Sequence, residues 1–156
     1  MNRYCLKHKG VPKGMKVAYA AFCTQHSLPD LRAWLVLEDE VTESTVRSAF
    51  HEKLASFCEF LSHLVWPEGI NALAEASELT EKEREHAHLL YDKCMLIEKD
   101  CLLAEIVSTP AEDMVLIKQL CAEWPSIVHD LREIVIKTKG AYRGHRQGAG
   151  DLSYLG

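Results

Sequence analysis

Apolar side chains recur every three or four residues along most of this chain, and this spacing restricts the fold more than any other sequence feature. On an α-helix such positions share one face, which is stable only when it is buried against other elements. The clearest example lies in residues 42–66, whose apolar positions are Val46, Phe50, Leu54, Phe57, Cys58, Leu61, Leu64 and Val65. The spacing predicts an amphipathic helix here and an all-α fold for the chain.

A longer helix is expected from about residue 80 to residue 108. Thr80 followed by Glu83 has the spacing of a capping box, in which each side chain hydrogen-bonds a backbone N–H at the start of the helix. One apolar row along this segment comprises Ala87, Leu90, Cys94, Ile97, Cys101 and Ala104, and a second comprises Leu89, Leu96 and Leu103. Because more than half of its circumference is apolar, we expect this long helix at the centre of a bundle.

The same spacing predicts further helices over residues 15–26, 31–40, 67–76, 109–124 and 125–136, which makes a bundle of six or seven helices without a strand. Pro67 and Pro125 are expected to end the helices before them, because proline disfavours the α conformation of the preceding residue. A chain of 156 residues has the length of one domain. We assign it to residues 1–139, with a basic N-terminal segment at 1–14. Residues 140–156 contain five glycines and are expected to form a flexible or docked basic tail.

Charge is distributed unevenly along the chain. Residues 17–136 carry 9 Lys/Arg against 22 Asp/Glu, whereas residues 1–16 carry five basic side chains and residues 137–150 carry four, with no carboxylate in either segment. An acidic body with basic ends predicts that partners are contacted through the ends. The C-terminal basic segment has the composition of a single-strand nucleic-acid or partner contact, with candidate residues Lys137, Lys139, Tyr142, Arg143 and Arg146. The alternatives are an arm that docks on an acidic surface and a solvated tail whose charges offset the acidic body.

Two Cys-x2-His pairs near the N-terminus provide a possible metal site. Thiolate and imidazole are ligands that Zn²⁺ prefers, and four of them complete a tetrahedral site. The candidate ligands are Cys5, His8, Cys23 and His26. The alternative, which we favour, is that these side chains pack or lie on the surface. Most of the six cysteines fall within apolar patterns, so we expect free buried thiols rather than disulfides.

A polar pocket is a further candidate, because Cys94, Glu98, Cys101 and Glu105 share one face of the long helix. A buried glutamate is costly unless it is paired, so we expect either that Glu98 reaches the edge of this face or that the face is partly hydrated. We expect His51, by contrast, to belong to an exposed polar face.

These features favour a non-enzymatic interaction or regulatory protein that self-associates and contacts partners through its basic ends. The alternatives are a nucleic-acid-associated protein with the N-terminal zinc site, and an enzyme or cofactor-binding bundle with a pocket near Cys94–Glu105. No nucleotide-binding fingerprint is present, and no cofactor is expected apart from the possible zinc. No window approaches the ~20 apolar residues that span a bilayer, so we expect a cytoplasmic protein without a membrane partner.

Overall fold

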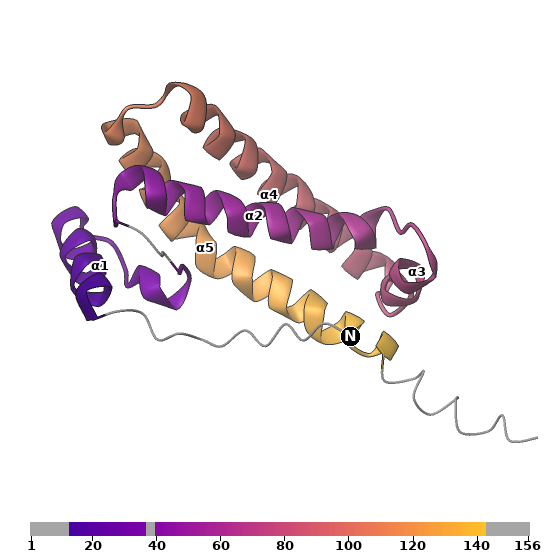
Figure 1. Ribbon diagram of the computed structural model, residues 1–156. Coiled ribbons are helices and arrows are strands. Elements are labelled where there is room, and N and C mark those ends of the chain that lie inside the picture. Colours follow the sequence, from indigo (N-terminus) through magenta and orange to yellow (C-terminus); the bar gives the residue numbers. More distant parts are fainter. Residues whose placement is uncertain (1–12, 37–39, 143–156) are drawn as a thin grey trace, which may run out of the picture.

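The computed structural model describes residues 13–36 and 40–142, and all of its regular structure is helical. Within these ranges the chain forms five α-helices and one short 3-10 helix (Figure 1). They are α1 (Lys13–His26), η1 (Leu31–Ala33), α2 (Glu43–Val65), α3 (Ile70–Ser77), α4 (Glu81–Val107) and α5 (Pro110–Thr138). The all-α prediction and the long helix at residues 80–108 are confirmed. The tail expected at 140–156 lies outside the described residues beyond Tyr142.

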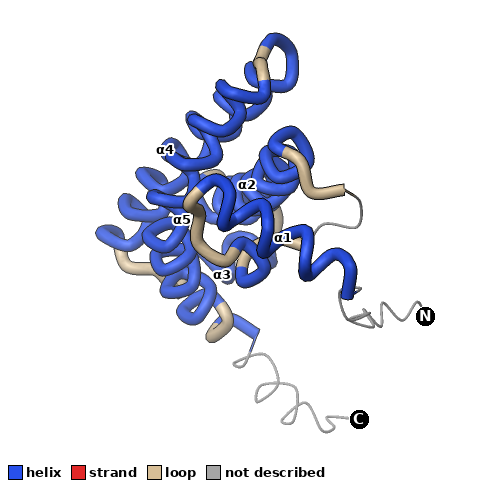
Figure 2. Tube along the Cα trace, turned by 90° about the vertical axis from the view of Figure 1, so that its left-hand side faces the viewer, coloured by secondary structure: helices blue, strands red, loops and turns tan. Residues whose placement is uncertain are grey.

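The body of the fold is a bundle of the three long helices α2, α4 and α5, each of which packs against the other two (Figures 1 and 2). The short helix α3 connects α2 to α4 at one end of the molecule. At the other end, α1 and η1 cover the start of α2. His26 Nε2, at the end of α1, lies 3.6 Å from Glu43 Oε1 at the start of α2. In the described residues, no helix is both long and apolar enough to cross a membrane.

Local side-chain chemistry determines where the long helices begin. The Thr80 N–H donates to the Glu83 carboxylate at 2.9 Å, as the capping box predicts. The Thr109 N–H donates to Glu112 at 2.7 Å, while Pro110 occupies the first helical position, where a missing N–H costs little. A similar reciprocal cap starts α2 at Thr42. These helix starts were therefore predictable from sequence.

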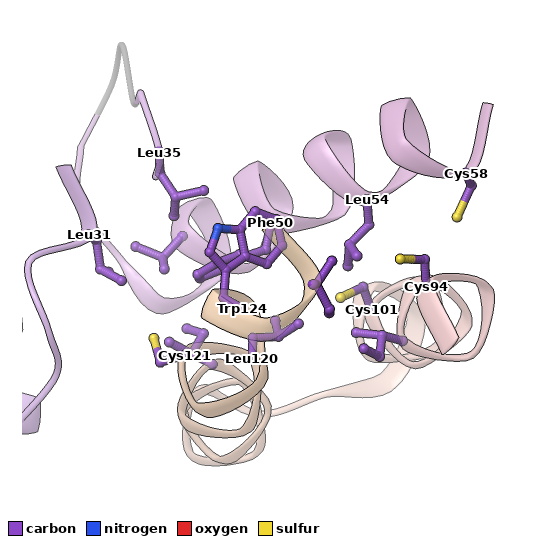
Figure 3. Packing of buried hydrophobic residues seen from close by; sticks show 14 of the residues in the cluster. Leu31, Leu35, Phe50, Leu54, Cys58, Cys94, Cys101, Leu120, Cys121 and Trp124 are labelled. Carbon is purple, nitrogen blue, oxygen red and sulfur yellow. The ribbon is translucent and has the colours of Figure 1, made fainter. Parts of the chain in front are cut away.

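Aromatic and aliphatic side chains from three helices meet in the core (Figure 3). Trp124 of α5 is 2% exposed, and its ring centroid lies 4.8 Å from that of Phe50 and 5.5 Å from that of Phe57 on α2. Leu31 and Leu35 extend this core toward α1, where the Tyr19 hydroxyl donates to the Leu35 carbonyl at 3.4 Å. The core thus joins α1 and η1 to the three long helices.

The expected number of helices is wrong in two places. The segments expected at 109–124 and 125–136 form one continuous helix, α5, with Pro125 inside it. Proline removes one helical hydrogen bond there, but Trp124 and Ile127 on either side of it are buried, and their packing keeps the helix continuous. In the described part of the segment expected as a helix at 31–40, only the single turn η1 is helical, because so short a helix is marginal without a long apolar face.

The short helix after α2 also starts later than expected, at Ile70 instead of residue 67. Gly69 precedes it with a φ of 90°, a left-handed conformation that glycine adopts without strain. This residue turns the chain between α2 and α3, so the helix begins only after it.

Candidate functional site

The four residues expected to form a polar pocket all lie on the side of α4 that packs against α2. Cys94 and Cys101 are fully buried, Glu98 is half-buried, and Glu105 is at the edge. Their contacts come from Arg47, Ser48, His51 and Cys58 of α2. The spacing along the sequence groups the α4 residues, but it does not reveal these α2 partners.

A buried ion pair lies at the centre of this region. Arg47 and Asp113 are each 5% exposed, and Arg47 Nε lies 2.9 Å from Asp113 Oδ1, although that N–H is not directed at the oxygen as a hydrogen bond requires. Arg47 Nη1 donates to the Cys101 carbonyl at 3.2 Å, and the Ser108 hydroxyl donates to Asp113 Oδ1 at 2.6 Å. The pair therefore joins α2, α4 and α5 at one point.

His51 extends this cluster toward the surface. Its Nε2 lies 3.7 Å from Glu98 Oε1 and its Nδ1 lies 3.7 Å from Glu105 Oε1, and its side chain is 20% exposed. The expectation that His51 lies on an exposed polar face is therefore wrong. Its two ring nitrogens face different carboxylates, and Glu105 Oε1 also lies 3.6 Å from Arg47 Nη1. The side chains of this polar cluster (Arg47, His51, Glu98, Glu105 and Asp113) thus contact one another.

The described cysteines are free thiols, as expected, and all of them are buried. Cys58 of α2 and Cys94 of α4 face each other (Figure 3). The Cys94 thiol donates a hydrogen bond to Cys58, which lowers the pKa of Cys58 and raises that of Cys94. Burial raises the pKa of Cys101 and that of Cys121 to about 11. At neutral pH Cys94, Cys101 and Cys121 therefore behave as small apolar side chains.

The proposed zinc ligands fall only partly within the described structure. Cys23 is buried on the core side of α1, and the His26 ring packs at 4.7 Å from the Phe22 ring and near Glu43. Cys5 and His8 lie outside the described residues. Within the described ranges no group of three or more His, Cys, Asp or Glu side chains is arranged to hold a metal ion. The four-ligand zinc site therefore stays a prediction.

Part of the C-terminal basic segment is engaged within the molecule. Lys137 Nζ contacts the Glu83 carboxylate at the start of α4, and the Tyr142 hydroxyl donates to Glu75 of α3. Lys139 is exposed, while Arg143 and Arg146 lie outside the described residues. The described part of this segment therefore contacts acidic side chains of α3 and α4.

The second apolar row of α4 points away from the core. Leu89, Leu96 and Leu103 are 62%, 69% and 59% exposed, and Val107 continues their line. They lie opposite the buried row Ala87, Leu90, Cys94, Ile97 and Cys101. We call Leu89, Leu96, Leu103 and Val107 the α4 outer face. The spacing of the leucines predicts this row, but we expected it on the packed surface of a central helix.

The two edges of the α4 outer face differ in chemistry. On the edge toward α5, Lys93 Nζ lies 3.1 Å from Glu123 Oε2 and His86 Nε2 lies 3.9 Å from Asp130 Oδ2. On the edge toward α2, the exposed Trp66 ring packs edge-on against the Tyr91 ring at 5.0 Å. A groove of about 530 Å³ opens beside it, lined by apolar Leu64, Val65 and Leu89 and by charged side chains that include Glu81 and Arg84. Apolar surface therefore continues from the outer face toward α2.

Comparison with known proteins adds no relationship, because no family model, no curated protein and no solved structure matches this chain. Its candidate sites consequently rest on the geometry described above.

Proposed function

We propose that this protein is a non-enzymatic interaction protein that binds a protein partner through the α4 outer face. The observation that carries the proposal is the row of three leucines, each more than half exposed, on the side of α4 opposite the core. Contiguous exposed apolar surface of this kind is typical of protein-binding sites, because burying it against a partner removes it from water. Inside the monomer these leucines contribute little to stability.

The polar cluster supports this proposal over an enzymatic role. A catalytic pocket presents unpaired acid, base or nucleophilic groups to a substrate. Arg47, His51 and Asp113 instead have partners on neighbouring helices at 2.9–3.7 Å. The cluster is better suited to fixing the angle between α2, α4 and α5, and therefore the position of the outer face.

The basic ends provide weaker support for nucleic-acid binding. Lys137 and Tyr142 are already engaged by Glu83 and Glu75, so binding to a phosphate backbone requires that these contacts break. An acidic body also repels nucleic acid over the rest of the surface. Contact of the basic ends with a protein partner remains part of the proposal.

Site-specific photo-crosslinking tests the outer face directly. A photoreactive phenylalanine analogue is placed at position 96, on the outer face, and in a control at position 17 of α1, where Val17 is 70% exposed. In cells of the source organism, we expect irradiation to give discrete crosslinked protein adducts from position 96 and none from position 17. Equal or absent crosslinking at the two positions would refute the proposal.

A further inference from the structure

We infer that the partner of the α4 outer face is a second copy of this chain, packed antiparallel about a two-fold axis through Leu96. This inference rests on the proposed function, because it names the partner of the same surface. In such a dimer Leu96 contacts the partner's Leu96, and Leu89 contacts the partner's Leu103. The α4 outer faces then cover each other.

The spacing of the leucines fits this symmetry. Leu89 and Leu103 each lie seven residues from Leu96. Seven residues span about 10.5 Å along a helix, at a rise of about 1.5 Å per residue. A two-fold axis at Leu96 therefore places every leucine of one copy opposite a leucine of the other. Residues seven positions apart occupy the same position of a heptad, and such a row can lie along the seam between two helices that cross at a shallow angle. A two-fold interface also uses one surface patch for both partners, so a single exposed row is sufficient.

The charges that flank the leucines are complementary in the same arrangement. Helical geometry places Asp92 and Lys99 on the α2-facing edge of the outer face, and Lys93 and Asp100 on the α5-facing edge. Antiparallel two-fold pairing brings like edges together with their directions reversed. Asp92 then lies near the partner's Lys99, and Lys93 lies near the partner's Asp100. The dimer thus gains four pairs of opposite charge around its leucine seam.

These side chains are free enough to form the pairs. Asp92 contacts His88 at 3.2 Å and Lys99 contacts Glu98 at 3.9 Å, but both side chains stay more than half exposed. Exposed ion pairs of this type are weak and exchange readily. Lys93 is 40% exposed beside Glu123 and keeps part of its surface free.

The antiparallel direction is favoured over the parallel one by the start of α4. This first turn carries Glu81 and Glu83, with Glu85 one turn further. Parallel packing places the acidic turns of both copies together, where like charges repel, and it also aligns the two helix dipoles. Antiparallel packing separates the acidic turns by most of the length of the helix, which is about 40 Å for its 27 residues. A seam along one helix is small for a specific interface, so we expect a dimer that dissociates on dilution.

The mass of the full chain in solution tests the inference. One chain has a mass of 17.7 kDa. In light scattering after size exclusion, loading from about 1 µM to about 300 µM is expected to raise the measured mass from that of one chain toward that of two. Leu96→Glu places two carboxylates on the symmetry axis and should keep the protein monomeric throughout. Val17→Glu, at an equally exposed apolar position on α1, should dimerise like the wild type. Circular dichroism should show the same helix content in all three proteins.

Charge exchange tests the direction of packing. Lys99→Glu places a carboxylate near the partner's Asp92 and should weaken dimerisation about tenfold. Adding Asp92→Lys restores opposite charges in the antiparallel dimer, so the double variant should recover most of the wild-type affinity. In a parallel dimer the double variant instead faces the partner's Lys93 and Asp100 with like charges and recovers nothing, which would overturn the antiparallel assignment.

Different results would contradict self-association and the proposed binding role of the α4 outer face. A wild-type protein that is monomeric at every concentration, or a Leu96→Glu variant that still dimerises, overturns the self-association. If crosslinking from position 96 then captures a different protein, the outer face is still a binding surface. If it captures nothing, the proposed function fails as well.

Discussion

The ion pair between Arg47 and Asp113 should be the most sensitive polar contact in the molecule. Asp113→Asn preserves the shape of the side chain and an oxygen that can accept the Ser108 hydrogen bond, but it removes the charge opposite Arg47. Both residues are 5% exposed, so water cannot replace the lost partner. The variant therefore leaves a cation inside the protein with incomplete compensation.

The magnitude follows from the remaining contacts. Removing one partner of a buried ion pair typically costs about 3–5 kcal/mol. Glu105 Oε1 stays 3.6 Å from Arg47 Nη1 and compensates part of the charge, although its side chain is 38% exposed. We therefore expect a loss of about 3 kcal/mol in the free energy of unfolding, which lowers Tm by about 6–12 °C for a domain of this size.

A double-mutant cycle measured by urea denaturation checks this reasoning. Arg47→Met should also destabilise, because it leaves Asp113 unpaired, but the double variant should be more stable than the sum of the two losses predicts by at least ~1.5 kcal/mol. The exposed pair Lys93–Glu123 provides the control, since Glu123→Gln should cost less than about 1 kcal/mol. Additive losses at Arg47 and Asp113, within about 0.5 kcal/mol, would show that the two side chains do not act as a pair.

Three further outcomes follow from single residues. Pro125 lies inside α5. Pro125→Ala restores a backbone donor there and should stabilise the protein by roughly 1 kcal/mol, and a lower urea midpoint would contradict this. Hydrogen bonds from the Thr109 N–H and hydroxyl lower the pKa of Glu112 below its ordinary 4.5. The Glu112 carboxylate therefore contributes its full stabilisation above pH 4.5, and this contribution is lost as the pH falls through the lowered pKa. Urea midpoints between about pH 6 and about pH 2 should therefore fall less for Glu112→Gln than for the wild type. Iodoacetamide at about pH 8 should label Cys58 before Cys101, because the pKa of Cys58 is lowered by its hydrogen-bonded neighbour and burial raises the pKa of Cys101 to about 11; equal labelling by peptide mass spectrometry would refute the assignment.

Elements whose boundaries depend on neighbouring residues were predictable from the sequence. The helix expected over residues 42–66 is α2, which runs from Glu43 to Val65. Its start is a reciprocal cap between Thr42 and Thr45, and its end precedes a Trp-Pro pair. These interactions act over three or four residues, so the sequence pattern contains the information that determines them.

Contacts between distant residues were not predictable in the same way. We expected His51 on an exposed polar face, and no sequence motif singles out Arg47 or Asp113. Only the packing of α2 against α4 and α5 brings the three side chains together. Pro125 was misjudged for a related reason, since the local cost of a proline is outweighed by the burial of Trp124 against a helix far away in sequence. Tertiary packing decides both cases.

The leucines of the α4 outer face show how a wrong expectation about burial can indicate a function. An apolar row in a sequence predicts that side chains are buried, but it does not say whether the surface that buries them belongs to the same chain. In this fold α2 and α5 pack on the inner half of α4, so the leucines of its second row stay more than half exposed. A helix that packs in its own bundle and also binds a partner needs apolar side chains on both of these faces. The excess of leucine on α4 is therefore best understood as a property of an assembly, and it is the feature to change first when partners are sought.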